Sequence, residues 1–177
     1  DHLDAPQAVV VGWSMGVQVN FELWRRAPER VAGILAINGT SGRPFRTIMG
    51  MAFLEKVIPS VINLMRAQAA FVGKAADKVA GSDALIAAMQ TFGMVSQTLD
   101  VDAFRDVAAG FRTLDWRIYG DLLERLNQHD AEDVLPTIRV PTAIVTGDKD
   151  VLTPPTTAER LRPAIPGARL RVIPGGT

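Results

Sequence analysis

A short apolar strand and the helix that follows it are joined by a turn with two glycines, and this arrangement restricts the fold more than any other feature. Residues 7–12 read Gln-Ala-Val-Val-Val-Gly, a run typical of a buried strand. Residues 17–26 favour a helix that Pro28 ends, and a second apolar run follows at residues 31–37. Strand, helix and strand in this order predict a βαβ unit, which requires a parallel sheet covered on both faces.

The turn itself reads Gly12-Trp13-Ser14-Met15-Gly16 and matches the nucleophile-elbow pattern G-x-S-x-G. A serine on so tight a turn has a strained backbone, and side chains two residues before and after it are expected to collide. The helix start directs N–H groups towards developing negative charge. We therefore predict that Ser14 is a nucleophile; the alternative is that Ser14 merely caps the helix.

Residues 43–128 show helical periodicity, with no convincing strand and no internal repeat. Apolar residues recur at helical spacing over residues 48–58 and 61–65, and Pro59 is expected to separate these two stretches. Further short helices are expected at residues 85–94, 104–111 and 119–126.

The same span holds five of the six methionines and six of the seven phenylalanines. Most of these side chains are expected to pack between helices, and a few could line an adaptable apolar pocket. The methionines are Met49, Met51, Met65, Met89 and Met94.

The α/β pattern resumes near Pro141. Residues 142–146 predict a strand, residues 156–161 a helix, and residues 169–173 a last strand. The chain thus divides into a core part at residues 1–42, a helical insertion at residues 43–128, and a second core part at residues 129–177.

The elbow, the segments at residues 27–31 and 37–40, and residues 140–154 resemble the α/β-hydrolase family, in particular its esterase, lactonase and cofactor-free haloperoxidase-like members. The resemblance implies the C-terminal part of that fold: a doubly wound parallel sheet with a helical lid inserted between two strands. It implies Asp150, the last residue of Gly147-Asp148-Lys149-Asp150, as the triad acid, with Asp148 as a weaker candidate better suited to a turn. It also implies that the Met15 amide binds the oxyanion.

The chain departs from the pattern of this family in the position of its histidines. The family order is serine, acid, histidine, whereas His2 and His129 both precede Asp150. His129 is a minor candidate for the base, and His2 is expected at the opposite end of the sheet. We expect a histidine within about three residues after Thr177. At ~30 residues per strand–helix unit, we also expect about 80 to 100 residues before Asp1.

The charge and the composition of the chain argue against several classes of partner and site. Nineteen basic residues balance nineteen acidic ones, which argues against nucleic acid as a partner. The absence of cysteine and the two distant histidines argue against a metal site. No apolar stretch is long enough for a membrane span.

The resulting prediction is a cofactor-free serine hydrolase that cleaves a small-molecule carboxylic ester, thioester or lactone with an apolar portion. The alternatives are a cofactor-free perhydrolase, acyltransferase or lyase on the same scaffold, or a non-catalytic binding or sensing protein of this fold.

Overall fold

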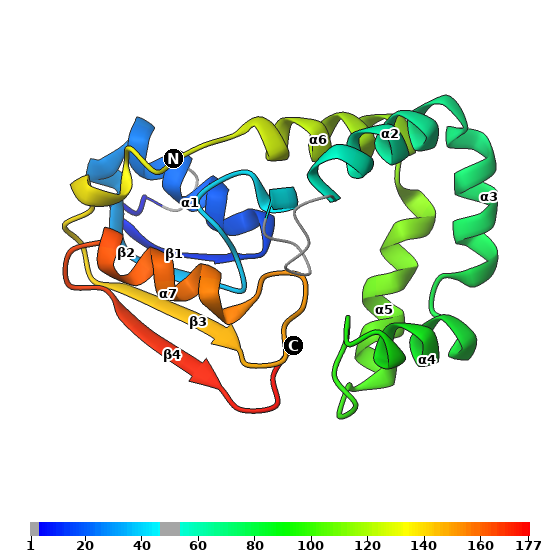
Figure 1. Ribbon diagram of the computed structural model, residues 1–177. Helices are drawn as coiled ribbons and strands as arrows, with labels where there is room; N and C mark the ends of the chain where they lie inside the picture. The colour runs from blue at the N-terminus through cyan, green and yellow to red at the C-terminus, as the bar shows by residue number, and fades with distance from the viewer. Residues whose placement is uncertain (1–3, 47–53) are drawn as a thin grey trace.

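A four-stranded parallel sheet runs through the computed structural model, which describes residues 4–46 and 54–177 (Figure 1). Strand order in the sheet follows chain order, and Ala36 lies between Gly12 on one side and Ile144 on the other. Parallel pairing places the carboxyl ends of all strands at one edge, where ligands bind in open α/β sheets. The strands are β1 (Ala8–Trp13), β2 (Val31–Ile37), β3 (Thr142–Gly147) and β4 (Arg169–Ile173).

Two helices, α1 (Met15–Arg26) and α7 (Pro155–Ala164), connect strand pairs and cover one face of the sheet. Both crossovers advance in the same direction along the sheet, so right-handed connections place both helices on the same side. One core cluster accordingly joins Phe21 of α1 and Leu161 of α7 to the alternate sheet residues Ile34, Ala36 and Ile144.

The other face of β1 is apolar and open within the described residues. The side chains of Val9, Val11 and Trp13 are each more than 60% exposed there.

Five helices of the described residues lie between β2 and β3 in the chain, and we call them the helical segment (residues 54–128). In Figure 1, α2 and α6 extend from the top of the core, and α3, α4 and α5 lie at the right of the view. Three of the five helices begin at side-chain caps: Ser82, Asp100 and Asp115 each accept a hydrogen bond from the first turn of a helix. These caps explain why the helices start two to three residues earlier than the apolar periodicity predicts. The helices are α2 (Leu54–Ala67), α3 (Ala69–Val79), α4 (Asp83–Thr91), α5 (Val101–Ala109) and α6 (Trp116–Gln128).

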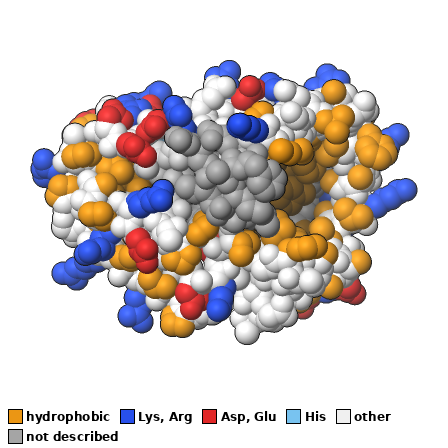
Figure 2. Space-filling view, in the orientation of Figure 1, with side chains coloured by type: hydrophobic (Ala, Val, Ile, Leu, Met, Phe, Trp, Pro, Cys, Tyr) orange, Lys and Arg blue, Asp and Glu red, His pale blue; other side chains and the backbone are white. Residues whose placement is uncertain are grey.

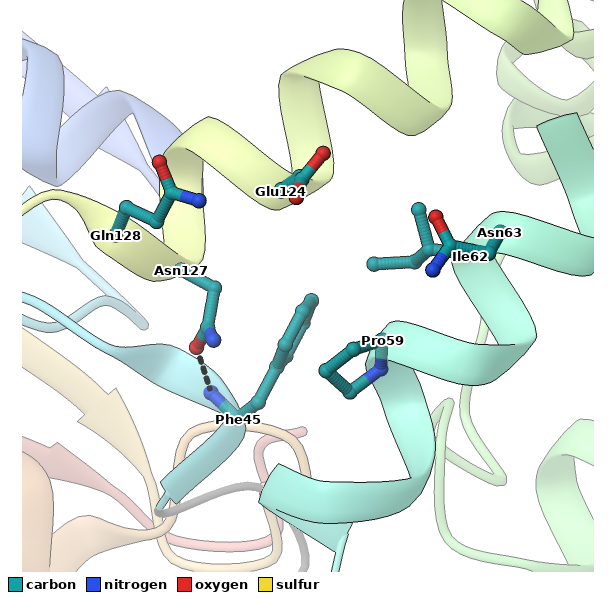
Figure 3. Close-up of a pocket in the computed structure, with 7 residues that line it drawn as sticks. All are labelled: Phe45, Pro59, Ile62, Asn63, Glu124, Asn127 and Gln128. Carbon is teal, nitrogen blue, oxygen red and sulfur yellow. Dashed lines mark hydrogen bonds between the residues drawn. The ribbon is translucent and has the colours of Figure 1, made fainter.

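Pro59 does not separate two helices, contrary to the prediction. It lies inside α2, which continues to Ala67. A proline near a helix start removes one backbone hydrogen bond, and packing of α2 against α6 offsets that loss. The Pro59 ring lies beside Phe45 at a cavity of about 100 Å³ between α2, α6 and the core (Figure 3).

Polar contacts fasten α2 to α6, and α6 to the segment that follows β2. Arg66 of α2 forms ion pairs with Asp121 and Glu124 of α6. The Phe45 N–H donates a hydrogen bond to Asn127 Oδ1 at 3.3 Å, at the margin of the same cavity (Figure 3).

The chain enters and leaves the helical segment at one crossing point. Gly42 and Asp130 form an isolated antiparallel bridge, flanked by a hydrogen bond from the Arg43 N–H to the His129 carbonyl at 3.2 Å. A second flanking bond runs from the Ala131 N–H to the Ser41 carbonyl at 2.9 Å. A side chain at Gly42 would lie 2.7 Å from the His129 carbonyl oxygen, so the two segments can approach this closely because residue 42 is glycine.

Phe21 provides a test of the core. Its side chain is fully buried between α1 and the sheet, so Phe21→Ala should lower the free energy of unfolding by about 3–5 kcal/mol. Leu23→Ala, on the more exposed face of the same helix, should cost less than about 1 kcal/mol. Urea unfolding of the full-length protein measures both values, and equal losses would contradict the assignment of Phe21 to the core.

Candidate active site

Ser14 occupies the turn between β1 and α1 in a backbone conformation that is rare for a residue with a side chain. Its φ is 53° and its ψ is −117°, a strained combination that costs on the order of 1–3 kcal/mol. The Ser14 N–H donates to the Ile37 carbonyl at 2.9 Å, which ties the turn to the end of β2. The Ser14 hydroxyl makes no capping hydrogen bond to α1, so the capping role considered from the sequence does not describe it.

The two glycines of the turn have different roles. A side chain at Gly12 would overlap the Gly16 carbonyl and lie 2.6 Å from Asn20 Nδ2, so α1 passes directly over Gly12. Among the described residues, a side chain at Gly16 would meet no atom within 4 Å. The expectation that both positions require glycine is therefore wrong for Gly16. The backbone of Gly16 lies close to residue 12, but a side chain at Gly16 would point into open space in the described part of the chain.

Met15 is the first residue of α1. Because the first N–H groups of a helix have no carbonyl partner within it, the Met15 N–H is available to a ligand. The partial positive charge of the helix start adds to its attraction for an anion.

Asp150 is held in a fixed orientation in the loop after β3. Its side chain is 9% exposed. Oδ1 accepts hydrogen bonds from the backbone N–H groups of Leu152 and Thr153, both at 2.8 Å, and Oδ2 accepts one from the Thr153 hydroxyl at 2.7 Å. These three donors restrict the rotation of the carboxylate.

Asp148 is exposed and binds the neighbouring loop instead. Its Oδ1 accepts a hydrogen bond from the Gly175 N–H at 2.7 Å, and its own N–H donates to the Ile173 carbonyl at 3.1 Å. Asp148 therefore joins the ends of β3 and β4, and it does not line the cavity that contains Ser14 and Asp150.

Ser14 and Asp150 line one cavity of about 500 Å³ at the carboxyl edge of the sheet. Trp13 and Asn38 also contribute to its wall, as does Thr177. The remaining wall includes residues from the helical segment, most of them apolar: Met94, Val95, Ser96, Thr98, Leu99 and Phe104. Of the methionines noted in the sequence, Met94 is therefore at the cavity, whereas Met49 and Met51 lie outside the described residues.

His129 is not brought to this cavity. It follows the last turn of α6, and its Nε2 lies 3.3 Å from Glu22 Oε2. The hydrogen bond from Arg26 holds the pKa of Glu22 below its ordinary value, against the opposing effect of burial, and the contact with His129 acts in the same direction as Arg26. His2 lies outside the described residues.

Asn38 and Thr153 are residues that the sequence reasoning did not single out. Thr153 lies three residues after Asp150, and Asn38 directly follows a strand. Neither position in the sequence predicts which group the side chain binds. Their roles depend on contacts that form between segments or within a loop whose shape the sequence does not specify.

Within residues 4–46 and 54–177, no group of three or more His, Asp or Glu side chains is arranged to hold a metal ion. Nor is any helix of these residues long and apolar enough to cross a membrane.

The family model described as the alpha/beta hydrolase fold matches residues 1–177. Among solved structures, the chain is similar to a thermophilic esterase from Thermogutta terrifontis, with 19% identity and a TM-score of 0.70 over 99% of this chain and 59% of that one. It is similar to a hydrolase from Oleispira antarctica, with 16% identity and a TM-score of 0.71 over 98% and 60%.

An enol-lactonase from Burkholderia xenovorans is also similar, with 22% identity and a TM-score of 0.63 over 97% of this chain and 58% of that one. The chain thus spans about 60% of the length of these three structures. At such identities the likeness shows a shared fold.

The two glycines of the turn give a matched pair of variants. Gly12→Ala should lower the free energy of unfolding by at least about 2 kcal/mol, because the new methyl group overlaps the backbone of α1. Gly16→Ala should leave stability unchanged or raise it by about 0.5–1 kcal/mol, since alanine is the better helix former and has room. Urea unfolding of the full-length variants measures both, and a costlier Gly16→Ala would show that α1 is placed differently.

Proposed function

Because this chain belongs to the alpha/beta hydrolase fold family, we propose that it is the part of a serine hydrolase that carries the nucleophile and the acid. Its reaction is the hydrolysis of a carboxylic ester, thioester or lactone through an acyl-enzyme. The observation that carries this proposal is that Ser14, on a strained turn, and Asp150, held by three hydrogen bonds, line one cavity.

Each of these residues has a chemical role in the proposed reaction. The Ser14 oxygen attacks the carbonyl carbon, its proton passes to a histidine, and the Met15 N–H donates to the oxygen that becomes negative. Asp150 orients that histidine and stabilises its cation. The histidine would come from outside residues 1–177, as the family order implies.

The cavity wall supports a substrate with an apolar portion. Met94, Leu99 and Phe104 of the helical segment contribute to the wall of the cavity that Ser14 and Asp150 line. Hydrophobic side chains also gather around a hollow in the half of the molecule that contains the helical segment (Figure 2). We therefore assign this segment the role of a lid, in which the residues at the cavity, between Met94 and Phe104, contact the apolar part of the substrate.

Covalent modification of Ser14 tests the mechanism. A fluorophosphonate should add its mass to the peptide that contains Ser14 in the full-length protein. Ser14→Ala should abolish this labelling and lower kcat for ester hydrolysis by at least about 10³-fold. Near-normal hydrolysis by a folded Ser14→Ala protein would sink the proposal.

The two aspartates of the acid loop give a second test. Asp150→Asn keeps the shape of the side chain but removes the charge that orients the histidine, so kcat should fall by up to about 10⁴-fold. Asp148→Asn is its matched control: it alters an exposed loop contact and should cost less than about tenfold. Steady-state kinetics on both full-length variants give the ranking, and the reverse ranking would move the triad acid to Asp148.

A further inference from the structure

Asn38 occupies the position between the two proposed catalytic segments. It directly follows β2, whose neighbours in the sheet are β1, which leads to Ser14, and β3, which leads to Asp150 (Figure 1). Since adjacent strands are about 4.8 Å apart, the end of β2 determines the separation between the other two ends. Asn38 also lines the cavity that contains Ser14 and Asp150.

Two hydrogen bonds tie Asn38 to β3. Its N–H donates to the Val145 carbonyl at 2.9 Å, and its Oδ1 accepts from the Gly147 N–H at 3.2 Å. Gly147 is the last residue of β3 and begins the turn that carries Asp150. The Asn38 side chain therefore bonds the backbone at the start of the acid-bearing loop.

The same residue is joined to the nucleophile through its neighbour. The carbonyl of Ile37 accepts the hydrogen bond from the Ser14 N–H. Asn38 itself has a φ of 44°, a left-handed conformation that asparagine adopts more readily than most residues. This conformation turns the chain at the end of β2, so that the side chain and the N–H can both reach β3.

Two hydrogen bonds, joined by the peptide bond between Ile37 and Asn38, thus connect Ser14 to Gly147. We infer that Asn38 is a positioning residue: its Oδ1 fixes the distance between the nucleophile and the acid by holding the start of the acid loop against the end of β2. This inference rests on the proposed serine-hydrolase function. It assigns Asn38 no contact with the reacting atoms.

Two variants separate the acceptor oxygen from the rest of the side chain. Asn38→Gly keeps the left-handed backbone accessible and removes Oδ1. Asn38→Asp keeps an oxygen that can accept from the Gly147 N–H and loses the amide N–H donors. Because the added carboxylate raises the pKa of a nearby histidine, rates are compared on the alkaline plateau of the pH–rate profile.

Asn127→Ala is the matched control. Asn127 also accepts a hydrogen bond from a backbone N–H through its side-chain oxygen, but at the cavity beside Phe45 (Figure 3), which is not the cavity that Ser14 lines. Its loss should affect thermal stability about as much as the loss of the Asn38 bond. It should leave kcat within about twofold of the wild-type value, because additivity holds for distant sites.

In the full-length protein, Asn38→Gly should lower kcat by about tenfold to 10²-fold with KM within about threefold, since small displacements of catalytic groups reduce the rate of the chemical step. Asn38→Asp should recover most of kcat on the plateau. Fluorophosphonate labelling of Ser14 in Asn38→Gly should slow in parallel with kcat.

The outcomes distinguish this inference from the proposed function. If wild-type Ser14 is labelled and Asn38→Gly retains wild-type kcat, the positioning role is wrong and the serine-hydrolase proposal stands. If Asn38→Asp is as slow as Asn38→Gly on the plateau, the acceptor oxygen is not what matters, and the inference is overturned. If wild-type Ser14 is not labelled and no ester is hydrolysed, both proposals fail. If Asn38→Gly does not fold, Asn38→Asp and Asn38→Ser are compared instead. Asn38→Ser shortens the side chain and should lower kcat, whereas Asn38→Asp should retain most of the wild-type kcat.

Discussion

The close approach of the first turn of α1 to the end of β1 is the contact on which the rest of the site depends. Gly12 lies directly against the Gly16 carbonyl, and this proximity forces the chain to reverse within the two residues around Ser14. The strained backbone of Ser14 follows from that reversal. The position of the Met15 N–H also follows from that reversal, because α1 begins at Met15, directly after the serine.

The same contact extends to β2. A side chain at Gly39 would lie 2.8 Å from the Ser14 carbonyl oxygen and would overlap Val17. The chain that leaves β2 thus passes against the elbow from the other side. The end of β1, the start of α1 and the chain that follows β2 therefore converge on one small volume, and close backbone packing holds them there where larger side chains would keep them apart.

The sequence predicts the core well because its signals are local. The apolar runs at residues 31–37 and 169–173 coincide with β2 and β4, and the βαβ order together with the elbow motif leads to the correct fold. The helical segment is less predictable: the periodicity misses helix starts that are determined by Ser82, Asp100 and Asp115, and Pro59 is accommodated by packing. In the candidate site, the elbow motif predicts Ser14 and the family resemblance implies Asp150, whereas nothing local points to Asn38, which forms hydrogen bonds with residues more than 100 positions away.

The crossing of the chain at Gly42 and Asp130 makes the helical segment a module. Because entry and exit are already hydrogen-bonded to each other, the sheet does not depend on the length of what lies between them, and the entropy of closing that loop changes slowly with its length. Insertions, deletions or a graft from another protein can therefore be introduced beyond this crossing without altering the register of β2 and β3. With the lid role that we propose for this segment, its exchange would alter substrate preference while the elbow and the loop that carries Asp150 stay unchanged.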